Sequence, residues 1–176
     1  LHTVQAAALG PVALWCAPDA GHRFFRALRA CCGIATSAQP AGDLGARMGA
    51  AVATHFTATP TLPLLIVGTD CPVLAPGHLQ QAARALATHD AVLIPAEDGG
   101  YVLLGLARPI PEVFETIPWS TDAVLARTRE RLRAAGARWC ELPTLWDVDE
   151  PADWRRLRAL GGDAVASPPP AQSVAD

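Results

Sequence analysis

Acidic residues occur at three points of the sequence where they could meet at one edge of a sheet. Asp70 follows the apolar run LPLLIV and a Gly-Thr pair, Asp98 precedes Gly-Gly between two further apolar runs, and Asp147-Val148-Asp149 comes shortly before Pro151. In open α/β sheets, ligands bind at the carboxyl ends of the strands. Carboxylates that meet there would supply the hard oxygen ligands that magnesium binds. All three groups are therefore candidates for metal or phosphate chemistry.

Each of these acids also has an ordinary structural explanation. Asp70 could cap the turn Thr-Asp-Cys-Pro, and Asp98 before Gly-Gly is a common turn residue. Asp149 could cap the helix that Pro151 opens. The residues alone leave both explanations open for every acid.

Composition limits the classes of function. The chain has 176 residues, of which 51% are hydrophobic and 18% charged. This length and hydrophobic content are enough for one domain with a sizeable core. Its net charge is −3 and all 14 basic residues are arginines, which does not favour nucleic-acid binding. A bound phosphate would have to be held by arginine, by backbone N–H groups or by a metal.

Cysteine and histidine spacing excludes several kinds of site. The five cysteines contain no C-x-x-C pair, so neither a zinc site nor a disulfide framework is indicated. No metalloprotease H-E-x-x-H, nucleophile elbow or Walker loop is present. Without an apolar run of about 18 residues or a leader pattern, we expect a cytoplasmic protein that does not enter a membrane.

Apolar periodicity predicts alternating strands and helices. We expect strands at 11–17, 62–68, 90–96 and 101–106 and helices at 1–9, from 21, from 43, from 76, at 121–135 and from 151. The residues expected to face inward on these helices are Phe24, Phe25, Leu28, Cys32; Leu44, Met48, Val52, Phe56; Leu79, Ala82, Ala83, Leu86; Val124, Leu125, Thr128, Leu132; and Trp154, Leu157, Leu160.

This alternation predicts one α/β domain over residues 1–160, a three-layer sandwich with a mostly parallel sheet. The short link 97–100 cannot form a parallel crossover, so one strand must run antiparallel. A sheet of this kind normally has a strand before the helix that ends near Leu9, so we expect its first strand to be lacking. Residues 161–176 show no apolar period and are predicted to be a disordered tail.

Five short motifs occur in order along most of the chain. They are Gln39 with GDLGARM (42–48), GTDCP (68–72), PAEDGGY (95–101), IPWST (117–121), and DVDEP (147–151) with Asp153. Together they resemble the DUF2064 family, glycosyltransferase-like proteins of the GT-A, or nucleotide-diphospho-sugar transferase, fold. The family's Gly-, Lys- and Arg-rich first loop, resembling K-A-P-x-P-G-x-V-K-T-R-L, has no counterpart here, which leaves catalysis by the chain as given open.

The resemblance implies a set of site residues. Asp70 and Asp149, with Asp147 as a weaker candidate, would bind Mg²⁺ or Mn²⁺ that bridges nucleotide phosphates. The residues implied near the nucleotide are Gln39, Gly42, Asp43, Gly45, Arg47 and Asp70, and the free N–H groups of a helix N-terminus favour anions there. Asp98 is the implied catalytic residue, with Gly99 and Gly100 on the acceptor side. Tyr101 and Trp119 are also placed with the acceptor and could stack on a base or sugar, or could equally be core or rim aromatics.

Three functions remain open at this point. The first is a metal-dependent transferase that moves a glycosyl group from a nucleotide sugar to a small acceptor. The second is a nucleotidyltransferase of the same fold. The third is a non-catalytic nucleotide-binding or assembly domain, because a sheet that lacks an inner strand exposes edges that pair with a partner, and a homodimer is compatible with this.

Overall fold

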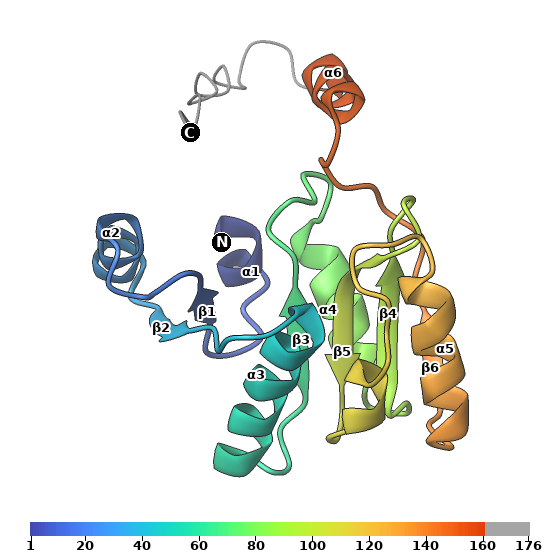
Figure 1. Cartoon of the computed structure of the whole chain (residues 1–176). Coiled ribbons are helices and arrows are strands. Elements are labelled where there is room, and N and C mark those ends of the chain that lie inside the picture. The colour runs from blue at the N-terminus through green and yellow to red at the C-terminus, as the bar shows by residue number, and fades with distance from the viewer. Residues whose placement is uncertain (161–176) are drawn as a thin grey trace.

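The computed structural model describes residues 1–160, and the predicted disordered tail lies outside the described residues. Figure 1 shows the order of the elements along the chain. The strands are β1 (Ala13–Cys16), β2 (Ala35–Ala38), β3 (Leu64–Val67), β4 (Ala91–Pro95), β5 (Tyr101–Leu106) and β6 (Trp139–Glu141). The helices are α1 (His2–Ala6), α2 (Arg23–Cys32), α3 (Leu44–Ala58), α4 (Pro76–Ala85), the 3₁₀ helix η1 (Pro111–Phe114), α5 (Val124–Ala134) and α6 (Pro151–Leu160).

The larger sheet has the strand order β3-β5-β4-β6. Strand β5 is antiparallel to both β3 and β4, while β6 is parallel to β4. Strands β3, β4 and β6 therefore run in one direction, and β5 is the one antiparallel strand that the short link predicts. Strands β1 and β2 form a separate parallel pair within residues 1–160.

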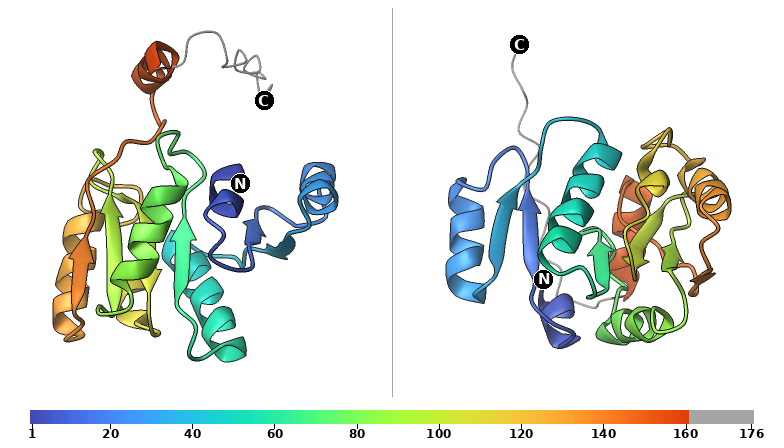
Figure 2. Two further views of the ribbon diagram at one scale, coloured as in Figure 1. Left: turned by 180° about the vertical axis from the view of Figure 1, so that it is seen from behind. Right: turned by 90° about the horizontal axis from the view of Figure 1, so that it is seen from below.

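Helices cover both faces of the larger sheet, which gives the predicted three layers (Figure 2). In β4, Ala91 and Leu93 pack toward α3, η1 and α5, whereas Val92 and Ile94 pack toward α1 and α4. This alternation follows the two-residue period of a strand. Both central strands are buried because each has a neighbour on either side and a helix layer on either face.

The predicted inward faces of two helices are confirmed, except that Ala83 of α4 is only half-buried. Val124, Leu125, Thr128 and Leu132 of α5 are all buried, as are Leu79 and Ala82 of α4 and the adjoining Leu86. None of the helices within residues 1–160 combines the length and the apolarity that crossing a membrane requires.

Three residues predicted to face inward are exposed instead. Leu44 is 47% exposed because it is the first residue of α3 and precedes the packed turns. Phe24 is 57% exposed because α2 covers only the two-stranded sheet and buries no residue. Leu160 is 65% exposed because α6 projects beyond the end of the larger sheet, as Figure 1 shows.

Sequence patterns also missed several short elements. Strand β2 has the sequence ATSA, β6 has only three residues, and η1 has four, so none of them carries a readable apolar period. The first helix is shorter than the predicted range 1–9. Strand β3 is half-buried because it lies at an edge of its sheet.

Candidate functional site

The topology brings the three acidic groups to one edge of the larger sheet. Asp70 follows the end of β3, Asp98 lies between β4 and β5, and Asp147 and Asp149 follow β6. Because β3, β4 and β6 are parallel, their carboxyl ends meet at this edge. Beyond β6, a parallel bridge between Ala96 and Leu145 keeps the two acidic loops side by side.

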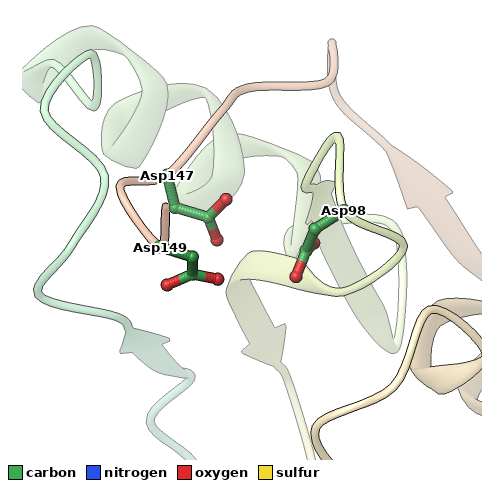
Figure 3. A group of neighbouring side chains, drawn as sticks. All are labelled: Asp98, Asp147 and Asp149. Carbon is green, nitrogen blue, oxygen red and sulfur yellow. The ribbon is translucent and has the colours of Figure 1, made fainter. Parts of the chain in front are cut away.

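Three carboxylates converge at this edge. One oxygen from each of Asp98, Asp147 and Asp149 lies within 4.8 Å of the others, and Figure 3 shows their side chains turned toward a common space. Magnesium binds oxygen at about 2.1 Å, so two ligands on opposite sides of the ion lie about 4.2 Å apart. Small side-chain rotations would therefore place all three oxygens around one such ion. We call Asp98, Asp147 and Asp149 the carboxylate triad.

Electrostatics supports a cation at the triad. Burial raises the pKa of Asp147 to about 6, and the negative charges of Asp98, Asp149 and Asp70 act in the same direction. The pKa of Asp149 is also raised, first by burial and then by Asp70 and Asp98. Within residues 1–160, none of the ion pairs includes a triad residue. A divalent cation would relieve this repulsion, so the residues present fit a metal site.

Asp70 lies beside the triad. Its backbone carbonyl accepts a hydrogen bond of 3.0 Å from the N–H of Val148, which fixes it next to the loop that carries Asp147 and Asp149. Its side chain turns back toward its own strand, with Oδ1 2.8 Å from the position that a Cβ on Gly68 would take. The structure thus groups Asp98 with two of the three predicted ligands, whereas the Asp70 carboxylate lies outside the triad and acts on it through its charge.

A tight turn holds Asp98. Its Oδ1 accepts a hydrogen bond of 2.8 Å from the N–H of Gly100, so it is also the turn residue that the sequence allowed. Gly99 has φ +93°, and a Cβ there would collide with the backbone of Asp122. The N–H of Leu125 donates to the carbonyl of Gly99 at 2.8 Å. The start of α5 therefore fixes the turn that presents Asp98.

Of the residues predicted near the nucleotide, all but Asp70 gather at the start of α3. Asp43 caps this helix by accepting a hydrogen bond of 2.8 Å from the N–H of Ala46. Arg47 donates to the carbonyl of Gly42 at 3.0 Å and to Oε1 of Gln39 at 3.4 Å. The cap explains locally why the helix begins there.

Trp119 joins this group to the acidic edge. Its indole packs directly against Gly45, where a Cβ would touch Nε1 of the ring and lie 2.9 Å from the carbonyl oxygen of Phe114. The same loop carries Asp122, whose backbone contacts Gly99. The loop that follows η1 therefore touches both the start of α3 and the turn of Asp98.

Tyr101 lies against the hydrophobic core. It packs on the cluster formed by α3, η1 and α5, which corresponds to the core explanation for this aromatic. Its hydroxyl is buried beside Thr128 and forms no hydrogen bond of standard geometry within residues 1–160. Burial raises the pKa of this phenol far above its usual range.

Two residues support the acidic loops in a way that the sequence did not predict, although one of them, Asp153, belongs to the fifth motif. Oδ2 of Asp153 accepts hydrogen bonds from the N–H groups of Asp149 at 3.2 Å and Glu150 at 2.9 Å. An acid in the first turn of a helix is a readable signal for such a bond. Arg156 forms an ion pair with Glu97, and no local pattern could have found it because the two residues are 59 positions apart.

The chain belongs to the DUF2064 family, described as an uncharacterized protein conserved in bacteria, whose profile matches residues 1–121. That match contains Asp70 and Asp98 and ends before Asp147. The chain is also similar to the crystal structure of a proposed nucleotide-diphospho-sugar transferase from Desulfovibrio desulfuricans G20, with 28% identity and a TM-score of 0.80. The similarity covers 92% of this chain and 71% of that one. No curated protein matches the chain. The family and the fold predicted from the motifs are both confirmed.

Proposed function

We propose that the protein is a metal-dependent transferase that takes a nucleotide sugar as donor and passes the glycosyl group to a small acceptor. The observation that carries this proposal is the carboxylate triad at the ligand-binding edge of the sheet. The shared fold and the name of its solved structural neighbour support the choice of a nucleotide sugar. Mg²⁺ or Mn²⁺ is the proposed cofactor, because its preferred ligands are carboxylate oxygens.

The proposed roles follow from where the side chains lie. Asp147 and Asp149 would hold the cation together with Asp98, and Asp70 would contribute to the same negative field. When bound, the cation supplies positive charge that stabilises the departing nucleoside diphosphate. The chain's own residues hold the backbones that carry these carboxylates before the donor arrives, through the turn at Gly100 and the hydrogen bonds of Asp153, which is a preorganisation that such electrostatic stabilisation needs.

Asp98 has a second proposed role on the acceptor side. It is exposed in the link between β4 and β5, where an acceptor hydroxyl could reach Oδ2, the carboxylate oxygen that does not accept the hydrogen bond from Gly100. A carboxylate within hydrogen-bond reach of an acceptor hydroxyl can take its proton as the glycosyl bond forms. Gly99 and Gly100 are proposed on the acceptor side because they form the same turn as Asp98, with the backbone of Asp122 packed against Gly99.

Calorimetry with nucleotides tests the binding half of the proposal. The 176-residue chain is titrated with UDP, GDP and ADP in the presence of Mn²⁺ and again with EDTA. We expect micromolar binding of at least one diphosphate that disappears without the metal. Asp149→Asn should abolish it, whereas Glu112→Gln, a change to an exposed acid on η1, should not. Equal affinities in Asp149→Asn and the wild type would refute the proposed site.

Product analysis tests the reaction. The protein is incubated with Mn²⁺ and the sugar conjugates of the nucleotide that binds, with small polyols as acceptors. Release of nucleoside diphosphate supports glycosyl transfer. Release of pyrophosphate from a nucleoside triphosphate and a sugar phosphate would replace the proposal by nucleotidyl transfer. Absence of nucleotide binding under every condition would favour the assembly domain.

A further inference from the structure

One arginine connects the two loops that carry the carboxylate triad. Arg156 of α6 donates two hydrogen bonds to Glu97, from Nη1 to Oε2 at 2.6 Å and from Nη2 to Oε1 at 3.0 Å. Its guanidinium also lies 4.4 Å from the ring centroid of Trp146. The paired hydrogen bonds and the stacking each suit the flat guanidinium and could not both be kept by lysine.

The positions of Glu97 and Trp146 in the sequence connect Arg156 to the carboxylate triad. Glu97 precedes Asp98 in the chain and Trp146 precedes Asp147, so the guanidinium joins the residues that stand next to the triad in both loops. Trp146 is 7% exposed, so it forms a fixed platform. Asp153, on the same helix, holds the N–H groups of Asp149 and Glu150. Helix α6 therefore contacts both acidic loops.

The contact does little for the packing of α6. The helix buries no residue within residues 1–160, and it lies beyond the end of the sheet in both Figure 1 and Figure 2. Both partners of the ion pair are about half-exposed, and exposed pairs contribute little to overall stability. The three triad charges meanwhile repel one another between the two loops that the arginine connects. The contacts of Arg156 are placed to hold the two loops together against this repulsion.

We infer that Arg156 is a positioning residue for the metal site: the backbone bridge of Ala96 and Leu145 joins the two loops, and beyond it Arg156, by holding Glu97 on Trp146, adjusts the separation of Asp98 from Asp147 and Asp149. This inference rests on the proposed function, since it concerns the affinity of the same site for a cation. Residues that orient metal ligands from outside typically change metal affinity about 10- to 100-fold when they are removed.

The sign of the effect separates positioning from simple charge. If Arg156 acted only through its positive charge, its removal would make the site more negative and tighten cation binding. If Arg156 instead holds the loops in position, its removal should weaken cation binding, because the loops relax apart and the three oxygens no longer fit one ion. The test is Mn²⁺ binding to the full chain, measured by electron paramagnetic resonance at pH 7.5, with the wild type, Arg156→Ala, Arg156→Lys and the control Arg155→Ala. Circular dichroism and the melting temperature verify folding.

We expect Mn²⁺ affinity to fall about tenfold in Arg156→Ala. Arg156→Lys should lose several-fold although its charge is kept, and Arg155→Ala, on the same exposed helix, should match the wild type. Unchanged or tighter binding in either folded Arg156 variant overturns the inference while the proposed function stands. A wild type that binds no Mn²⁺ overturns both, so the two failures are distinguishable.

Discussion

Replacing Asp147 by asparagine should stabilise the metal-free protein and remove its response to metal. Asparagine keeps the size of the side chain and loses the charge. Asp147 is the member of the carboxylate triad whose pKa is raised to about 6, first by burial and then by the charges of Asp98, Asp149 and Asp70. A group whose ionised form is disfavoured in the folded state lowers the free energy of unfolding once it is ionised.

The size of the effect follows from the geometry of the triad. Its oxygens lie within 4.8 Å of one another. Two unit charges at that separation repel by about 0.9 kcal/mol in water and by about 3.5 kcal/mol at an effective dielectric constant of 20. Asp98 and Asp149 are exposed and Asp147 is half-buried, so we use the figure for water, and the two repulsions involving Asp147 sum to about 2 kcal/mol. The raised pKa alone would give about 3 kcal/mol without solvent screening, and about 1–2 kcal/mol with it.

The melting temperature, measured at pH 7.5 and again at acidic pH, tests this prediction. For a domain of this size, 1 kcal/mol corresponds to about 2–4 °C, so Asp147→Asn should melt about 3–6 °C above the wild type at pH 7.5 with EDTA. The difference should shrink on acidification, because the wild-type penalty is absent below the ordinary pKa of 3.8 and grows as the pH rises through about 6. Added Mn²⁺ should raise the wild-type melting temperature and leave the variant unchanged. A variant that melts lower than the wild type, and still responds to Mn²⁺, would refute the reasoning.

Three further predictions concern the same region. Mn²⁺ affinity measured by calorimetry should be constant above pH 7 and fall as the pH drops through about 6, because protons then compete for Asp147; a flat profile to pH 5 would contradict this. Gly45→Ala should displace the indole of Trp119, because the new Cβ would touch its Nε1 and lie 2.9 Å from a backbone oxygen. We expect the free energy of unfolding to fall by about 1–3 kcal/mol and the tryptophan fluorescence to shift, and an unchanged spectrum would contradict this. Asp70→Asn should weaken metal-dependent nucleotide binding about tenfold while stability changes by no more than about 0.5 kcal/mol, and full binding would show Asp70 to be only a turn residue.

Most of the fold could be predicted from local patterns. The stripes of α4 and α5 repeat at helical spacing and are buried as expected. The direction of β5 followed from a link too short for a crossover, which is a purely geometric constraint. The meeting of the acidic groups at one edge followed from their positions after strands that run the same way.

What could not be predicted depends on contacts between distant segments. The bridge from Ala96 to Leu145 decides which carboxylates face one another, and no local pattern encodes it. It brings Asp98 into the triad, although the motif had suggested a catalytic role for it. The prediction that Leu160 faces inward was wrong for the same reason, because an apolar stripe is buried only when a second element lies opposite.

Anomalous X-ray diffraction from crystals grown with Mn²⁺ and the nucleoside diphosphate that binds would test the central claim most directly. The proposal of a metal-dependent transferase predicts one manganese peak about 2.2 Å from oxygens of at least two of Asp98, Asp147 and Asp149, with the diphosphate completing its coordination. No manganese peak at these carboxylates, or a diphosphate bound elsewhere on the molecule, would contradict it.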